Sequence, residues 1–378
     1  MTDPRVEKLA HVLINYSLGL KRGQYIRIAG PAVAAPILRE CVRAAIRRGA
    51  HVETSVQLDG LDEILYKEGS REQLRWVSPV AKYRTRKLDA VCHIRGEVNT
   101  RALTGCDPKK VAEVAKANKP VRKIFFERAA AGELRWALTQ WPTQASAQDA
   151  EMSLAEYEDF VFTGGHLDDA DPVATWKAIS RTQQVLARRL NRAKEIRLLA
   201  ADTDLTFSCR DRKWINCCGH ENFPDGEVFT GPIEDSVNGH IRFSFPAVRQ
   251  GREVTDVTLE FKAGKVVKAT ASKGLDYLKA MIAMDAGSQF VGETAFGCNY
   301  NITRYTRNTL FDEKIGGTFH LALGMGYPET GSKNTSGLHW DMVCDLRDGG
   351  EVYADGTLIQ KNGRFLDKAM PQPKAKRR

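Results

Sequence analysis

The first half of the chain alternates between helical and strand patterns of apolar and polar residues. Within residues 5–19, apolar side chains recur at helical spacing and predict one buried face, at Val6, Leu9, Ala10, Leu13 and Ile14. The predicted helices cover 5–19, 33–48 and 108–117, and the predicted strands cover 25–29, 51–58, 88–94 and 121–126. Strands separated by helices of this length are typical of a parallel sheet covered on both faces.

A mainly helical stretch is expected over residues 151–195. Ser153 suits an N-cap, because Glu156 stands three residues later in the position of a capping box. A second helix runs from about Pro172 to Lys194, since proline is well suited to a first helical turn. The cations of this second helix indicate a solvated face, and the helix connects the two halves of the chain.

From Ile196 onward, strands follow one another through tight turns. Asp-Gly and Asn-Gly pairs at 348–349, 355–356 and 362–363 are favoured hairpin turns. One helix is predicted over 274–286, and strands are predicted over 196–200, 205–209, 240–244, 253–261, 265–272, 338–346, 351–354 and 358–361. We therefore expect the second half to be mostly antiparallel β-structure.

These patterns predict three segments. Residues 1–190 form an α/β domain with a helical connector, 191–367 form a β-rich domain, and 368–378 form a disordered basic tail. The net charge is +9, but the tail supplies five of these positive charges and no acid. The rest of the chain is weakly basic and has no basic platform interleaved with aromatic residues, so specific nucleic-acid binding is not expected.

Composition also bears on compartment and cofactor. No apolar stretch approaches the roughly 20 residues that span a bilayer, and the polar start lacks the apolar core of a signal peptide. The eight cysteines are scattered without a CxxC spacing, and the adjacent Cys217 and Cys218 would point to opposite faces of a strand. The segment 30–34 has too few glycines to cradle a phosphate. We expect a cytoplasmic protein without a membrane partner or a nucleotide.

The candidate chemistry lies in the second half. His339 and Asp341 are two residues apart on a predicted strand, so they point to the same face as a metal requires. Glu227, Glu293 and His320 each stand in a short apolar segment bracketed by glycines. Singly, such residues are more often a surface glutamate or a satisfied core histidine, but their joint occurrence favours a metal site.

The size of this set bears on the number of ions. Five ligands exceed the three that a catalytic zinc ion takes, whereas two ions that share a carboxylate would use all five. Mixed imidazole and carboxylate ligands suit Zn²⁺, Co²⁺ or Mn²⁺ better than Ca²⁺. The cofactors are therefore expected to be two divalent metal ions.

Several segments, in order along the chain, resemble the thermophilic-type metallo-aminopeptidases, the group of aminopeptidase T, aminopeptidase S and leucine aminopeptidase II. The segments are NFPDGEVFTGPIEDSVNG, GETAFGCN, GGTFHLALGMGYPETG and LHWDMV, with similar stretches in the middle of the chain. The resemblance runs from near residue 5 to residue 367. It implies a homodimeric dinuclear exopeptidase that removes N-terminal residues from peptides, with an N-terminal α/β domain and a β-rich C-terminal domain.

The resemblance also assigns roles to residues. The family's metal ligands fall on Glu227, Glu293, His320, His339 and Asp341, and its catalytic tyrosine falls on Tyr327. The implied mechanism is attack by a metal-bound hydroxide, with the oxyanion held by metal and Tyr327. Glu293 is expected either to bridge the metals or to act as the base.

Two parts of this interpretation stay open. The substrate's α-amine is expected to meet a metal or an acid such as Glu234 or Asp235, and Trp141, Phe229 and Trp340 are candidates for the pocket lining. The alternatives to an aminopeptidase are another dinuclear hydrolase, such as an amidase on the same scaffold, or a non-catalytic metal- or nucleic-acid-binding protein.

Overall fold

The computed structural model describes residues 3–249 and 251–373. The chain divides into two compact units, each formed by two segments of the sequence. The first unit contains residues 1–173 and 219–223, and the second contains 174–218 and 224–378. No helix within the described residues is both long and apolar enough to cross a bilayer.

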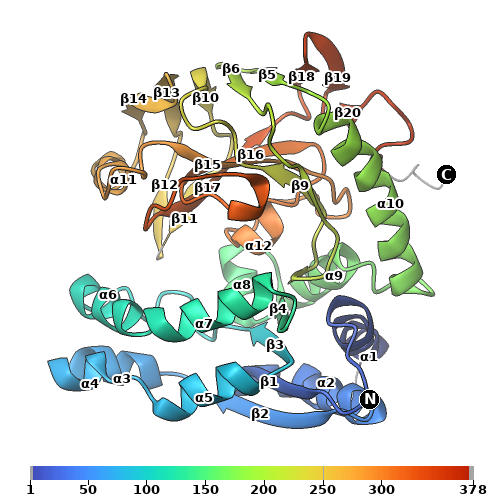
Figure 1. The fold of residues 1–378 in the computed structure, drawn as a ribbon, viewed down its shortest axis with the longest axis vertical. Helices are drawn as coiled ribbons and strands as arrows, with labels where there is room; N and C mark the ends of the chain where they lie inside the picture. Colours follow the sequence, from blue (N-terminus) through green and yellow to red (C-terminus); the bar gives the residue numbers. More distant parts are fainter. Residues whose placement is uncertain (1–2, 250, 374–378) are drawn as a thin grey trace. The chain divides into compact units, whose positions relative to one another are not determined.

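The first unit is built on a five-stranded sheet in the order β2-β1-β3-β4-β8 (Figure 1). All its neighbouring strands run parallel, as the alternating pattern predicts. The strands are β1 (Tyr25–Pro31), β2 (His51–Gln57), β3 (Ala90–Arg95), β4 (Arg135–Gln140) and β8 (Asn222–Phe223). The α/β fold class expected for this part of the chain is therefore confirmed.

Helices join and cover these strands. The apolar positions predicted in the first helix are buried, although the helix changes from α1 to a π-helical turn at Val12–Ser17. The capping box predicted at Ser153 is present at the start of α9. The helices of this unit are α1 (Pro4–His11), α2 (Ala35–Arg47), α3 (Leu61–Glu68), α4 (Arg71–Arg75), α5 (Pro79–Lys87), α6 (Pro108–Ala117), α7 (Lys119–Ala130), α8 (Gln144–Asp149) and α9 (Leu154–Gly164).

The strand predicted over 121–126 is wrong, because this stretch lies inside helix α7. Ile124 and Phe125 follow Val121 by three and four residues, which places all three on one face of a helix. The short apolar run therefore also fits a helix, and Pro120 stands in its first turn. The next strand of the sheet is β4, which follows a turn at Gly132 with φ of +71°.

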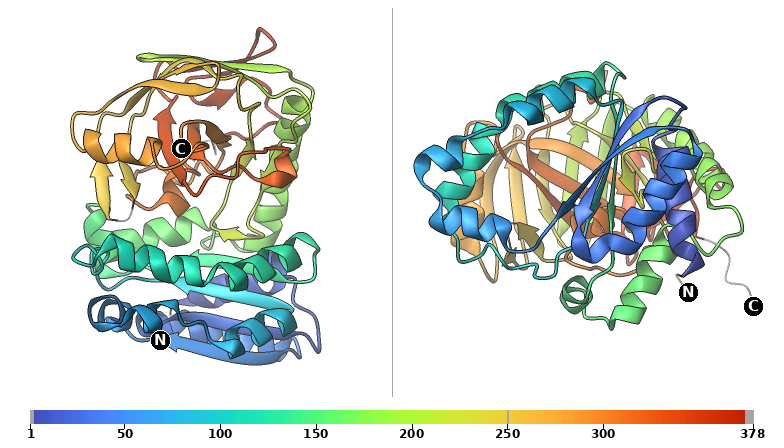
Figure 2. Two further views of the ribbon diagram at one scale, coloured as in Figure 1. Left: turned by 60° about the vertical axis from the view of Figure 1, so that its left-hand side comes forward. Right: turned by 90° about the horizontal axis from the view of Figure 1, so that it is seen from below.

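The second unit contains two antiparallel sheets and a small hairpin (Figure 2). The larger sheet has the order β14-β13-β10-β6-β5-β18-β19-β20, and the five-stranded sheet has the order β17-β16-β15-β9-β7. The larger sheet contains β5 (Glu195–Ala200), β6 (Thr203–Ser208), β10 (Asn238–Arg242), β13 (Thr258–Lys262), β14 (Lys265–Thr270), β18 (Glu351–Ala354), β19 (Thr357–Lys361) and β20 (Arg364–Phe365). The smaller sheet contains β7 (Ile215–Cys217), β9 (Glu227–Thr230), β15 (Val291–Gly297), β16 (Thr318–Gly324) and β17 (His339–Asp345).

The remaining elements complete this unit. Helices α10 (Pro172–Leu190), α11 (Leu275–Ile282) and α12 (Thr309–Asp312) accompany the sheets, and β11 (Ala247–Arg249) pairs with β12 (Arg252–Val254). The single strand predicted over 253–261 is two strands, β12 and β13. Asp256 between them has a positive φ of 51°, which ends the extended chain before β13 joins another sheet.

The core of this unit lies between the two large sheets. Phe207 of the larger sheet stacks on Phe319 of β16, with 6.2 Å between ring centroids, and Phe296 packs beside them. Met370, in the stretch expected to be a disordered tail, is also buried in this core, whereas residues 374–378 lie outside the described residues. Since one face of the five-stranded sheet fills the core, the polar side chains of β9, β15, β16 and β17 gather on its other face.

Candidate metal centre

Strand register brings the five predicted ligands to one face of the five-stranded sheet. Glu293 of β15 and Asp341 of β17 both pair with Ala322, the residue of β16 between them. His320 and His339 each stand two residues before one of these positions, so they share the face. Glu227 of β9 pairs with Gly297, four residues after Glu293, and therefore joins the same face.

Small residues leave room between these side chains. Ala295, Gly297 and Ala322 occupy the same face of β15 and β16, where a larger side chain would fill the space beside the carboxylates. Gly226, which precedes Glu227, has a φ of +122°, and a Cβ there would lie 2.7 Å from Cβ of Asn299. Glycine is therefore required at 226 for the turn that starts β9.

The donor atoms form two groups that share Glu293. Nε2 of His320 lies 3.4 Å from Oε2 of Glu227 and 3.4 Å from Oε1 of Glu293. Nε2 of His339 lies 3.5 Å from Oε2 of Glu293 and 3.4 Å from Oδ1 of Asp341. The two carboxylate oxygens of Glu293 thus face two different histidines.

These residues fit divalent metal ions. Glu227, Glu293 and His320 each offer a ligand atom within 4.8 Å of the others, and so do Glu293, His339 and Asp341. Among the described residues, Oε2 of Glu227 and Oδ1 of Asp341 are buried without a hydrogen-bond partner. Buried oxygens without a donor are costly unless a cation meets them, so their presence supports a metal site.

The charged groups of the cluster shift one another's pKa values. Burial alone disfavours a charged imidazole, but Glu293 and Glu227 raise the pKa of His320 to about 9. Asp341 and Glu293 likewise overcome burial and raise the pKa of His339 to about 10. Burial raises the pKa of Glu227 to about 8, although Lys314 opposes this shift. The carboxylates therefore favour positive charge at the place where a metal would bind.

The orientation of His339 is set from outside the cluster. Its Nδ1 lies 2.8 Å from the carbonyl oxygen of Met325, which leaves Nε2 facing Glu293 and Asp341. A backbone carbonyl that accepts from one ring nitrogen fixes the other nitrogen as the metal ligand. Arg249 donates to the carbonyl of His339 at 2.5 Å, which holds the start of β17.

Tyr327 stands next to this cluster on the loop after β16. Its ring contacts the rings of His339 and Phe229, with centroid distances of 5.5 and 5.4 Å. Burial and the carboxylates of Glu293 and Asp341 raise the pKa of Tyr327 well above 10, so its hydroxyl stays protonated as a donor. Glu234 and Asp285 bind this loop further along, at Lys333 N and Gly337 N, and so hold it in place.

Several residues near the cluster were missed by the sequence analysis. Glu313 forms a further potential ligand group with His320 and Asp341, and Cys217 forms one with Asp225 and Glu227. Lys314 is fully buried, and its Nζ lies 2.7 Å from Oε1 of Glu227 and 2.5 Å from Oε1 of Glu313. The one available signal was that Glu313 and Lys314 lie close in sequence to His320. This signal was weak, because charged residues after a short helix are usually solvated.

Other predicted residues lie elsewhere. The Glu234 carboxylate binds Arg212 at 2.6 Å and Lys333 N at 2.7 Å, so it is engaged in holding the loop. Trp340 is buried in the core on the opposite face of β17, between two residues of the cluster. Trp141 belongs to the first unit, where its ring packs near Phe162. Of the three aromatic residues proposed for the pocket, Phe229 is the one in contact with Tyr327.

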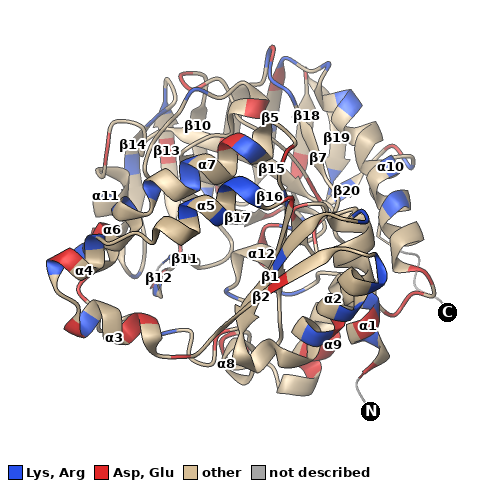
Figure 3. Ribbon diagram, turned by 60° about the horizontal axis from the view of Figure 1, so that its bottom comes forward, with Lys and Arg blue, Asp and Glu red and all other residues tan. Residues whose placement is uncertain are grey.

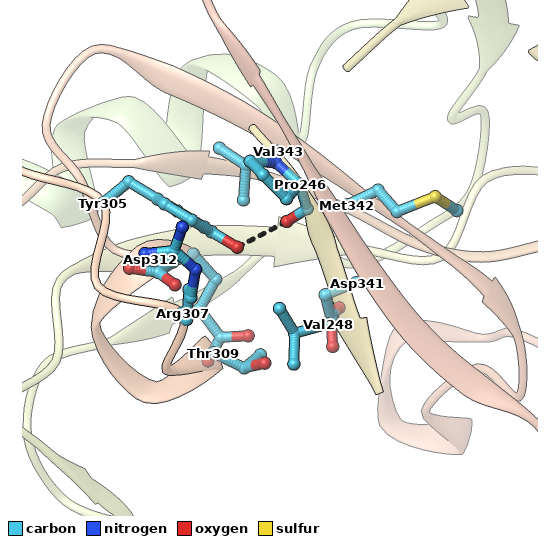
Figure 4. A pocket seen from close by; sticks show the side chains of 10 residues that line it. Pro246, Val248, Tyr305, Arg307, Thr309, Asp312, Asp341, Met342 and Val343 are labelled. Atoms are coloured by element: carbon cyan, nitrogen blue, oxygen red, sulfur yellow. Dashed lines mark hydrogen bonds between the residues drawn. The ribbon is translucent and has the colours of Figure 1, made fainter. Parts of the chain in front are cut away.

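A pocket of the second unit opens beside Asp341 (Figure 4). Its lining is partly apolar, with Val248 and Met342, and partly polar, with Arg307 and Thr309. The hydroxyl of Tyr305 donates to the Pro246 carbonyl at 2.5 Å and fixes one wall. The cluster is therefore bordered by a small space, about large enough for one water molecule.

The model of a family described as thermophilic metalloprotease (M29) matches residues 2–365. The chain belongs to this family. Aminopeptidase T of Thermus thermophilus is 26% identical over 406 residues, covering 96% of this chain and 98% of the relative. Aminopeptidase 2 of Geobacillus stearothermophilus is 26% identical over 354 residues, covering 86% and 84%. The resemblance to this group of metallo-aminopeptidases is therefore confirmed.

A solved structure shows the same fold. Wild-type AmpT from Thermus thermophilus matches with a TM-score of 0.84 at 24% identity, covering 96% of this chain and 99% of that one. The match spans nearly the whole of both chains. The combination of a parallel α/β region and antiparallel sheets is thus the fold of this solved structure as well.

Proposed function

We propose that this protein is a dinuclear metallo-aminopeptidase. The observation that carries the proposal is the position of Glu293, whose two oxygens lie 3.4 and 3.5 Å from the imidazoles of His320 and His339. One ion would bind Glu227, Glu293 and His320, and a second would bind Glu293, His339 and Asp341, with Glu293 as the shared ligand. The donor set suits Zn²⁺, Co²⁺ or Mn²⁺.

Bound at these ligands, two divalent ions would polarise the scissile carbonyl and lower the pKa of a water molecule. The chain's own groups supply the rest. The protonated hydroxyl of Tyr327 is a donor for the oxygen that becomes negative during attack. Glu293 faces both histidines with its two oxygens, and we assign it as the shared ligand that would hold the attacking water in place between the two ions.

The assignment to aminopeptidases rests on the relatives and on charge. The curated relatives that match most of this chain are named aminopeptidases. A substrate amine is a cation or a metal ligand, and either form suits a buried cluster of four carboxylates at Glu227, Glu293, Glu313 and Asp341.

Metal removal and one substitution test this function. Chelated protein should not release free amino acids from short peptides or aminoacyl anilides, and Co²⁺ or Zn²⁺ should restore the release. Glu293→Gln should lower kcat at least about 100-fold, while the exposed Glu260→Gln control in β13 keeps wild-type turnover. Equal hydrolysis of N-acetylated substrates would instead indicate an amidase.

A homodimer and a cytoplasmic location belong to the same proposal. Large apolar side chains are exposed in the first unit, including Trp76, Val80, Tyr83 and Phe126. Val80 and Tyr83 lie on α5, Phe126 lies on α7, which packs on α5, and Trp76 directly follows α4. An apolar surface of this kind marks an interface, and a second copy is the partner proposed here. All eight cysteines are free, as expected in a reducing compartment.

Nucleic-acid binding has less support. Lys and Arg are distributed over elements of both units, with Asp and Glu interspersed, as Figure 3 shows. Helices α5 and α7 carry several cations, but α3 and α9 carry mainly acids. Mixed charge of this kind is typical of a solvated surface rather than of a phosphate-binding face.

A further inference from the structure

Lys314 is a fully buried ammonium group beside the proposed metal ligands. Its Nζ lies 2.7 Å from Glu227, 2.5 Å from Glu313 and 3.9 Å from Asp225. A buried lysine is rare without paired acids, so this residue is part of the charge balance of the cluster. The mechanism described above assigns it no role.

The backbone around Lys314 is tied to the turn that presents Glu227. The carbonyl of Lys314 accepts from Asn299 N at 3.0 Å, and the Asn299 side chain donates to the Asp225 carbonyl at 2.9 Å. Cys298 N donates to the carbonyl of Gly226 at 2.7 Å. The ammonium therefore has a fixed position relative to the Glu227 carboxylate.

The two oxygens of Glu227 have different partners. Oε1 binds Lys314, whereas Oε2 faces His320 at 3.4 Å and has no hydrogen-bond partner among the described residues. A carboxylate held in this way offers one oxygen to a metal. In the absence of the ammonium, Oε1 would lose its partner, and the carboxylate would no longer be held in this orientation.

The ammonium also lies beside another group of potential ligand atoms, which shares Glu227 with the first. Cys217 pairs with Glu227 across β7 and β9, and with Asp225 the two residues offer ligand atoms within 4.8 Å of one another. Two of these three residues are the partners of Lys314. A divalent ion and the ammonium would compete for the same carboxylates.

The net charge of the proposed centre also supports a role for Lys314. Five carboxylates lie in or beside the cluster, at Asp225, Glu227, Glu293, Glu313 and Asp341. Two divalent ions leave one negative charge uncompensated when both histidines are neutral ligands. The Lys314 ammonium cancels it, so the buried centre would be neutral with two ions bound.

We propose that Lys314 is a permanent cation of the metal centre, which fixes Glu227 as a one-oxygen ligand and takes the place of a further divalent ion between Asp225, Glu227 and Cys217. Lys314 is thus a positioning residue rather than a catalytic one. The inference rests on the proposed two-ion centre.

Titration of the metal-free, full-length protein with Co²⁺ tests the inference, with bound metal and the absorption spectrum as readouts. Wild type should bind two ions per chain without thiolate-to-Co²⁺ absorption. Lys314→Met, which fills the space without charge, should bind one of the two ions at least about tenfold more weakly. Lys314→Ala, which empties the space, should bind an additional ion and show the thiolate band.

Two further variants test whether the thiol of Cys217 and the positive charge at position 314 account for these results. Cys217→Ser in the Lys314→Ala background should abolish the thiolate band, and Lys314→Arg should retain the two-ion stoichiometry. Circular dichroism establishes folding first. If Lys314→Ala does not fold, Lys314→Met decides alone, and wild-type affinity and spectrum in that variant would overturn the role of Lys314. Absence of Co²⁺ binding by wild type would instead overturn the two-ion centre itself.

Discussion

At the scale of single residues, the five candidate ligands each stand in a short apolar segment, where a charged side chain needs a reason. Glu293 and His320 are such positions, and the structure places them 3.4 Å apart. Glu313 and Lys314 could not be predicted, because a Glu-Lys pair after a short helix is usually solvated. Their burial depends on the return of the chain from α12 to β16, which no local pattern reveals.

Gly226 sets the backbone turn that directs the side chain of Glu227. Gly226→Ala should destabilise the protein by about 1–3 kcal/mol, since the left-handed backbone and the 2.7 Å approach to Asn299 both oppose a Cβ. It should also weaken Co²⁺ binding by moving Glu227. Urea unfolding and metal titration measure the two effects. Gly105→Ala is the matched control, because a Cβ at 105 meets no atom within 4 Å, and equal effects of the two substitutions would contradict this account.

At the scale of elements, long periodic stretches were predictable and short apolar runs were not. Helix α6 begins and ends where the periodicity indicates, whereas the run at 121–126 fits a helix and a strand equally well. Strand β8 has two residues and no pattern of its own, and it is a strand because β4 offers it hydrogen bonds. Pairing partners, rather than local propensity, decide such elements.

His93 of β3 gives the first unit a pH-dependent stability. Burial, together with the nearby Arg95 and Arg27, lowers the pKa of His93 below 6.5 in the folded protein. Below pH 6.5 the unfolded chain therefore binds more protons, so stability that is present above that pH is lost as the pH falls through the folded pKa. Each pKa unit by which the folded and unfolded states differ corresponds to about 1.4 kcal/mol of unfolding free energy.

The substitution His93→Gln removes this dependence. Its free energy of unfolding should fall less between pH 7 and pH 5 than that of wild type, as measured by urea unfolding at each pH. The control His51→Gln changes an exposed histidine of β2 in the same sheet and should follow the wild-type curve. A parallel decline of wild type and His93→Gln would show that His93 does not titrate in this way.

At the scale of the whole molecule, the two fold classes were predictable but the sheet order was not. The larger sheet places β5 beside β18, more than a hundred residues later in the sequence. Such pairings are fixed by burial of the whole apolar face, including Phe207 and Phe319, and not by any motif. The residue types of the candidate site were visible in the sequence, and the register that brings them to one face depends on long-range pairings.

The proposed dimer is testable at this scale. Trp76 is 67% exposed and is close in sequence to Val80 and Tyr83, two further exposed apolar side chains of the first unit. Trp76→Ser should raise the dimer dissociation constant at least about tenfold, because buried tryptophans dominate interface energies. Light scattering after size-exclusion chromatography over a concentration series measures it. Leu366→Ser, an exposed position of the second unit, should not change the dimer, and a monomeric wild type throughout the series would refute the interface.

Because of strand β8, the first part of the gene alone does not encode the complete sheet of the first unit. The strand that completes the parallel sheet is encoded only four residues before Glu227, within the stretch that otherwise builds the second unit. A chimaera that exchanges everything after residue 173 with an M29 relative would also exchange the last strand of the first unit's sheet. Recombination between such genes should therefore favour junctions that keep residues 219–223 with the parent of β4, because a foreign edge strand must match its hydrogen-bond register.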